Sequence, residues 1–98
     1  MIKELKFTWD EKKAKSNLLK HNVSFEEAKT VFEDENARLI FDPDHSEEEE
    51  RFILLGLSIK SKILTVVHCY RDEEQNIRMI SARKSTKAEQ IQYKEFLI

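Results

Sequence analysis

The stretch from residue 51 to residue 82 constrains the fold most, because it holds three strand-like runs with very short connections. RFILLGLS (51–58) and ILTVVHCY (63–70) are rich in apolar and β-branched residues, and KSK (60–62) lies between them. NIRMISA (76–82) follows after RDEEQ. Strands joined by such short loops pair antiparallel, which predicts a three-stranded meander.

The segment before this meander supplies one strand and two helices. LKFTW (5–9) alternates apolar and polar residues, as a half-buried strand does. Asp10 is suited to cap a helix over about residues 11–21, and Asn22 suits its left-handed end. SFEE (24–27) is a capping box, in which the serine caps a second helix and the last glutamate reaches back.

Two further elements complete the predicted order. ARLIF (37–41) reads as a strand that stops at the turn-forming DPDHS (42–46). TKAE (86–89) is another capping box, which predicts a last helix to about Leu97 with Ile91 facing inward.

The resulting order is β-α-α-β-β-β-β-α, in a chain of 98 residues that fits one domain over 1–98. This order predicts an α+β fold with an antiparallel sheet and helices packed mainly on one face. A period of two places Ile77, Met79, Ser81 and Arg83 on one side of their strand.

No apolar run is long enough to span a membrane, and the N-terminal IKELKFTW has no signal-peptide pattern, so a cytoplasmic protein without membrane contact is expected. The net charge is -2, but it is unevenly distributed. Residues 1–59 hold 9 Lys and Arg against 14 Asp and Glu, whereas residues 60–98 hold 8 against 5. The basic part is therefore the C-terminal part.

Two sites in the meander carry groups of chemical interest. His68 lies between Val67 and Cys69 in a central strand, where an imidazole must be hydrogen-bonded, paired or functional, so a core role and a catalytic role both remain open. Arg83 and Lys84 end a strand just before a capped helix, a place suited to holding a phosphate. The alternative for Arg83 is a plain ion pair with a carboxylate.

The set as a whole fits RNA cleavage without a metal, which needs a base, an acid and cations for the phosphorane. His68 would serve the proton transfer, and Arg83, Lys84 and Arg51 would supply positive charge. Ion pairing is the alternative for Arg51. No metal or nucleotide cofactor is expected, because the three histidines lie in different elements and the only glycine lies inside a strand.

Two more arginines are candidate RNA contacts. Arg71 and Arg78 flank the loop of the last hairpin, although a turn role and a cross-strand role are their simpler interpretations.

Three blocks of this sequence resemble the BrnT family of bacterial type II toxins. They are FTWDEKKAKSNLLKHNVSFEEAKTVF (7–32), DPDHSEEEERF (42–52) and ILTVVHCYRDEEQNIRMISARKSTKAE (63–89). The resemblance implies a RelE-like fold and a metal-independent endoribonuclease that inhibits translation. It also implies neutralisation by a BrnA-like antitoxin with a ribbon-helix-helix domain, through which alone the complex would contact DNA.

By position, the resemblance assigns phosphate or transition-state contact to Arg83, with His68 and Arg51 in support. The N-terminal block is expected to have a structural role or to contact the antitoxin; its matching residues are Trp9, Asp10, Asn17, Lys20 and His21. The alternative function is a catalytically inactive partner that only binds an antitoxin and takes part in transcriptional autoregulation.

Overall fold

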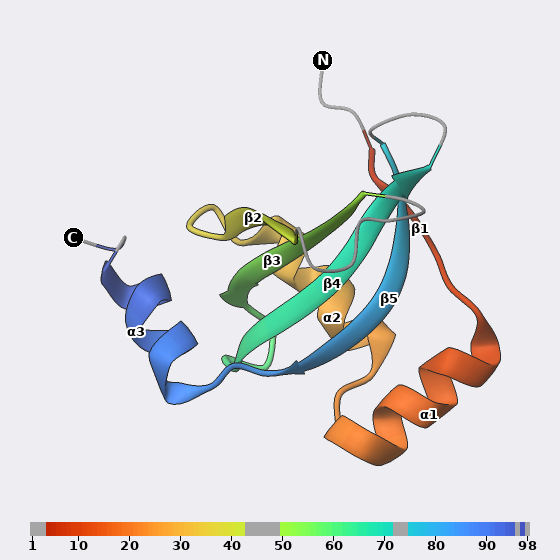
Figure 1. Ribbon diagram of the computed structural model, residues 1–98, viewed down its shortest axis with the longest axis horizontal. Helices are drawn as coiled ribbons and strands as arrows, with labels where there is room; N and C mark the ends of the chain where they lie inside the picture. Colours follow the sequence, from red (N-terminus) through yellow and green to blue (C-terminus); the bar gives the residue numbers. More distant parts are fainter. Residues whose placement is uncertain (1–3, 43–49, 72–74, 96, 98) are drawn as a thin grey trace.

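Residues 4–42, 50–71, 75–95 and 97 are described by a computed structural model (Figure 1). The elements in chain order are β1 (Lys6–Thr8), α1 (Glu11–His21), α2 (Phe25–Lys29), the 3-10 helix η1 (Thr30–Glu33), β2 (Arg38–Asp42), β3 (Arg51–Leu57), β4 (Ile63–Arg71), β5 (Asn76–Lys84) and α3 (Lys87–Glu95). This order matches the predicted one, with η1 as a continuation of α2. The turn expected at 43–46 lies outside the described residues. None of the described helices is long and apolar enough to cross a membrane.

The five strands form one sheet in the order β1-β5-β4-β3-β2. The pairs β2–β3, β3–β4 and β4–β5 are antiparallel, which confirms the predicted meander. β1 instead pairs parallel to β5, so the sheet is mixed and the expectation of an antiparallel sheet was wrong for this strand. The direction of β1 depends on the path of the two helices that follow it, and no short loop in the sequence specifies that path.

One side of the sheet, here called the helix face, packs against the first two helices and η1. In Figure 1, α2 lies behind the sheet. The core on this face consists of Val23, Phe25, Ala28 and Val31 from the helical layer and Leu54, Leu64, Val66, Ile77, Met79 and Ala82 from the strands. Gly56 allows η1 to approach β3 closely, because a Cβ atom there would lie 2.7 Å from Cγ1 of Val31.

The helix starts follow the predicted capping residues, with one difference. Asp10 accepts hydrogen bonds from the backbone of α1, and Asn22 ends that helix in the left-handed conformation at φ 55°. Ser24 Oγ accepts from the N–H of Glu27 at 3.0 Å. The Glu27 carboxylate does not complete the capping box: it is buried and accepts a hydrogen bond from Ser58 at 2.7 Å. A tertiary contact thus replaces the predicted local one.

Asn17 attaches α1 to the sheet. Its side-chain amide donates to the carbonyl of Ala82 at 2.8 Å and accepts from the N–H of Ala82 at 3.0 Å. The amide also donates to the carbonyl of Val23 at 2.9 Å. This buried side chain therefore has a structural role, one of the two expected for the N-terminal block.

The last helix begins as predicted but packs through a different residue. Glu89 N–H donates to Thr86 Oγ1 at 3.2 Å and the Thr86 N–H donates to the Glu89 carboxylate at 2.8 Å, so the capping box is complete. The predicted inward residue, Ile91, is 58% exposed. Tyr93 is buried instead, and its hydroxyl donates to Asp34 Oδ2 at 2.6 Å. The hydrogen bond to Asp34, the residue that follows η1, therefore helps to turn the Tyr93 side of α3 towards the rest of the protein.

Candidate functional site

An irregularity between β4 and β5 decides which residues of the last hairpin share a face. Val67 pairs with Ser81, but the next residue, His68, pairs with Met79, so β5 contains one extra residue. A bulge of this kind shifts the alternation of side chains. Met79 therefore lies in the core of the helix face, whereas Arg83 lies opposite it. The expectation that they share a side was wrong, because a period of two does not reveal bulges.

His68 lies on the helix face and is fully buried. Its ring centroid lies 4.9 Å from that of Phe32 and 5.3 Å from that of Tyr70. Nδ1 is 3.4 Å from the Val66 carbonyl, while Nε2 has no hydrogen-bond partner among the described residues. Burial lowers the pKa of His68 from 6.5 to about 4. A neutral imidazole enclosed by aromatic rings favours the core interpretation over the catalytic one.

Arg83 lies on the opposite face and forms a two-pronged ion pair. Its guanidinium donates to both carboxylate oxygens of Glu89, at 2.7 and 3.0 Å. This interaction raises the pKa of Arg83 and lowers that of Glu89 to about 2. The ion-pair alternative is therefore realised, yet the Arg83 side chain stays 41% exposed and can meet a ligand.

The face opposite the helix face gathers arginines from four strands. Strand register places Arg83 beside Thr65, Arg78 beside Cys69, and Arg51 beside Asp42 on this side. The full set, here called the arginine face, is Arg38, Arg51, Arg71, Arg78 and Arg83. Cys69 is also buried on this face.

Arg38 was absent from the sequence-based candidates, and Lys84 falls elsewhere. A lone arginine at the start of a strand gives no signal until the register of β2 and β3 is known. Lys84 pairs with Leu64, a core residue of the helix face, and is exposed at the strand end. It therefore does not join the arginine face.

Arg51 has an unusual environment. Its Nε atom is buried and has no hydrogen-bond partner among the described residues. Buried donors are normally paired, because an unpaired one loses its hydration without replacement. A bound anion would supply the missing acceptor.

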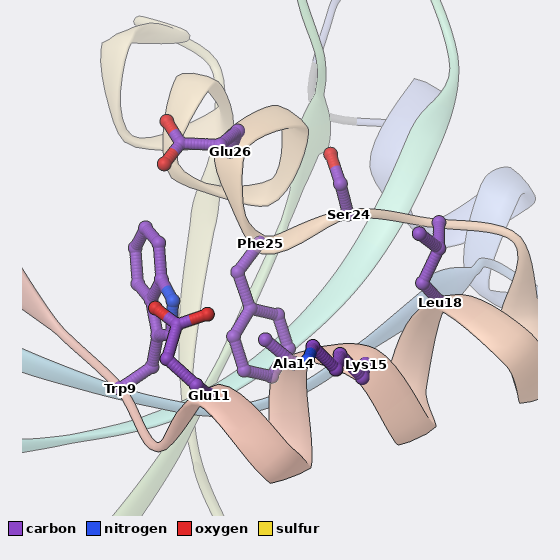
Figure 2. A pocket seen from close by; sticks show the side chains of 8 residues that line it. All are labelled: Trp9, Glu11, Ala14, Lys15, Leu18, Ser24, Phe25 and Glu26. Atoms are coloured by element: carbon purple, nitrogen blue, oxygen red, sulfur yellow. The ribbon is translucent and has the colours of Figure 1, made fainter.

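The N-terminal block forms a separate, smaller site. Trp9 packs edge-on against Phe25 at 5.7 Å between centroids. Figure 2 shows these rings beside Ala14 and Leu18 in a pocket of about 240 Å³ between α1 and the start of α2. Glu11, Lys15, Ser24 and Glu26 also line the pocket. The packing of Trp9 on Phe25 agrees with a structural role, one of the two roles expected for the N-terminal block.

Two comparisons with known proteins identify the class. The crystal structure of the Brucella abortus ribonuclease toxin BrnT, solved at 1.1 Å, superposes with a TM-score of 0.62 and 21% identity. The match covers 85% of this chain and 99% of that chain, so the two proteins share a fold. No curated protein matches the sequence.

The family follows from the sequence. Residues 9–89 match the model of the ribonuclease toxin BrnT of type II toxin-antitoxin systems. The chain belongs to the BrnT family, as the three sequence blocks indicated. Membership in a type II system implies an antitoxin partner.

Proposed function

We propose that this protein is a metal-independent endoribonuclease that binds RNA on the arginine face and thereby blocks translation in the cytoplasm. The observation that carries the proposal is the convergence of Arg51 from β3 and of Arg78 and Arg83 from β5 on one face. Guanidinium groups bind phosphates through paired N–H donors, and several together attract a polyanion.

The chemistry that this face would support is attack of a ribose 2′-oxygen on the adjacent phosphorus. The 2′-oxygen to phosphorus bond forms while the bond to the 5′-oxygen breaks; one proton leaves the 2′-hydroxyl and one reaches the 5′-oxygen. Arginine side chains stabilise the extra negative charge of the phosphorane between these events. Glu89 holds the Arg83 guanidinium in a fixed orientation and, by occupying two of its donors, competes with phosphate for it.

His68 is not required in this scheme. It is fully buried on the other side of the sheet, so RNA on the arginine face would not reach it. The proton transfers would then involve solvent or the RNA itself, with the arginines supplying the rate enhancement.

The partner proposed for this protein is a BrnA-like antitoxin with a ribbon-helix-helix domain, and the fold is proposed to be RelE-like. In that arrangement the antitoxin alone contacts DNA, and the complex regulates its own promoter.

A second candidate is a catalytically inactive chain that binds the antitoxin only. The burial of His68 favours it, because the histidine suggested for proton transfer by the sequence is enclosed in the core. The two candidate functions differ in whether the chain, in the absence of its antitoxin, cleaves RNA and arrests growth.

The test is an incubation of the purified chain with total RNA in excess chelator, together with growth of cells that express the chain without antitoxin. We expect RNA fragments and growth arrest, and loss of both in Arg83→Ala. Lys60→Ala, at an exposed position in the β3–β4 connection, is the matched charge control. Intact RNA together with normal growth would support the inactive candidate and contradict the nuclease proposal.

A further inference from the structure

Part of the helix face is left uncovered by the helices. A cavity of about 510 Å³ lies there, lined by the apolar side chains of Leu5, Phe32, Leu39, Phe52, Tyr70 and Ile77. These residues come from η1, from β2, β3, β4 and β5, and from the residue preceding β1. The cavity, here called the trough, therefore crosses the whole width of the sheet.

A second cavity extends the trough along η1. It has a volume of about 430 Å³ and shares Leu5 and Phe32 with the first, and Phe7 adds another ring. Leu39 at the trough is 52% exposed and Leu5 is 39% exposed. Apolar surface of this extent on a small protein marks a binding site for an apolar partner.

His68 lies directly behind the aromatic wall of the trough. Phe32, Phe52 and Tyr70 line the cavity on one side and contact the imidazole ring on the other, with centroids between 4.9 and 6.2 Å away. The buried Nε2 atom has no partner among the described residues. His68 itself lines neither cavity, so it supports the aromatic wall from behind and does not contact the space in the trough.

Among the described residues that line the two cavities, the charges are mainly negative. Glu50 lines the first cavity and Glu4 and Glu33 line the second, and Lys29 is the one cation among these described lining residues. Carboxylates repel the phosphates of RNA, so the trough does not continue the arginine face. They attract a partner that carries lysine or arginine beside its apolar side chains.

The dimensions fit a helix. Five strands spaced about 4.8 Å apart span about 19 Å between the outer two, the length of a helix of about 13 residues. A helix placed there would also continue the layer that α1, α2 and η1 form on the same face.

We propose that the trough binds an amphipathic helix of the antitoxin, with apolar side chains against Phe52 and Tyr70 and basic side chains beside Glu4, Glu33 and Glu50. The inference rests on the proposed function, because it takes the antitoxin as the partner. It assigns toxin activity and antitoxin binding to opposite faces of the sheet.

The test uses the antitoxin encoded beside the toxin gene as the probe and measures its Kd for trough variants. Leu39→Lys places a charge among the apolar walls, and Glu50→Lys reverses a rim charge; both positions are exposed, so the fold tolerates them. Leu19→Lys is the matched control, because Leu19 lies on α1 outside the trough and is 88% exposed. Melting curves confirm that each variant is folded.

We expect both trough variants to weaken binding by about tenfold or more and the control to change it by less than about twofold. Expressed alone, all three variants should still arrest growth, but only the trough variants should escape neutralisation by the antitoxin. Failure of the toxin to arrest growth at all would instead count against the proposed function.

Wild-type affinity in either trough variant would overturn the inference. So would a wild-type dimer that Leu39→Lys converts to a monomer without loss of antitoxin binding, because a second copy of the chain would then occupy the trough. Loss of antitoxin binding in Arg78→Ala with normal binding by the trough variants would place the partner on the arginine face.

Discussion

His68 and Arg83 come from the same β-hairpin and face opposite sides of the sheet. On the helix face, aromatic rings enclose His68, and burial lowers its pKa to about 4. On the arginine face, Arg83 keeps 41% of its side chain exposed and is held by a carboxylate. Of these two ionisable side chains, His68 is thus neutral and enclosed, whereas Arg83 is charged and accessible. Functional assignment therefore depends on which face a strand residue occupies.

The largest expected effect comes from removing charge from the arginine face. Arg51→Ala, Arg78→Ala and Arg83→Ala should each lower the rate of RNA cleavage by about a hundredfold, because each removes a cation from the phosphorane. Arg78→Lys is the matched control and should retain part of the activity, since it keeps the charge and loses the fork of donors. Single-turnover cleavage of a labelled RNA gives the rates. Wild-type rates in all three alanine variants would remove the arginine face from the reaction.

The next largest effect concerns stability on the helix face. The pKa of His68 is 6.5 in the unfolded chain and about 4 in the folded protein. Between these pH values the unfolded state therefore binds more protons than the folded state. Stability should therefore fall by up to about 3 kcal/mol as the pH drops through this range.

His68→Phe should remove this part of the pH dependence, because an apolar ring of similar shape has nothing to protonate. The free energy of unfolding from urea titrations at pH 7 and pH 5 measures the effect, with His21→Ala, at an exposed histidine, as the control. The same loss of stability in wild type and His68→Phe would show that other groups cause it.

The smallest effect concerns the ion pair that orients Arg83. Glu89→Gln should lower the free energy of unfolding by about 1 kcal/mol or less at pH 7, because both side chains are partly exposed. The carboxylate pKa is lowered to about 2, so the contribution is present above its ordinary pKa of 4.5 and is lost as the pH falls towards 2.

The same substitution should tighten RNA binding, because it removes a negative charge that competes with phosphate. Chemical denaturation and filter binding give the two quantities. Weaker RNA binding in Glu89→Gln would mean that orientation of the guanidinium outweighs the competing charge.

Local chemistry in the sequence predicted most of the secondary structure. Asp10, Asn22 and Thr86 define helix ends through contacts with their own neighbours, so the sequence around them is sufficient. Glu27 is the exception, because Ser58, 31 residues away, takes its carboxylate. The parallel direction of β1 also depends on distant parts of the chain.

The candidate site was predicted less well, for one physical reason. The bulge opposite Val67 and His68 shifts the alternation of β5, so Met79 and Arg83 separate onto different faces. The sequence identified Arg51, Arg78 and Arg83 as candidates but could not show that they share a face. In β4, His68 lies among the aromatic rings of the helix face. The core role that the sequence left open for it is consistent with its apolar neighbours in the strand.

The most direct test of the central claim, that the chemistry belongs to the arginine face and not to His68, is the single-turnover rate of RNA cleavage in chelator at pH 7 for two variants. We expect His68→Phe to cleave at close to the wild-type rate and Arg78→Ala to cleave about a hundredfold more slowly. An inactive but folded His68→Phe beside a fully active Arg78→Ala would contradict the account.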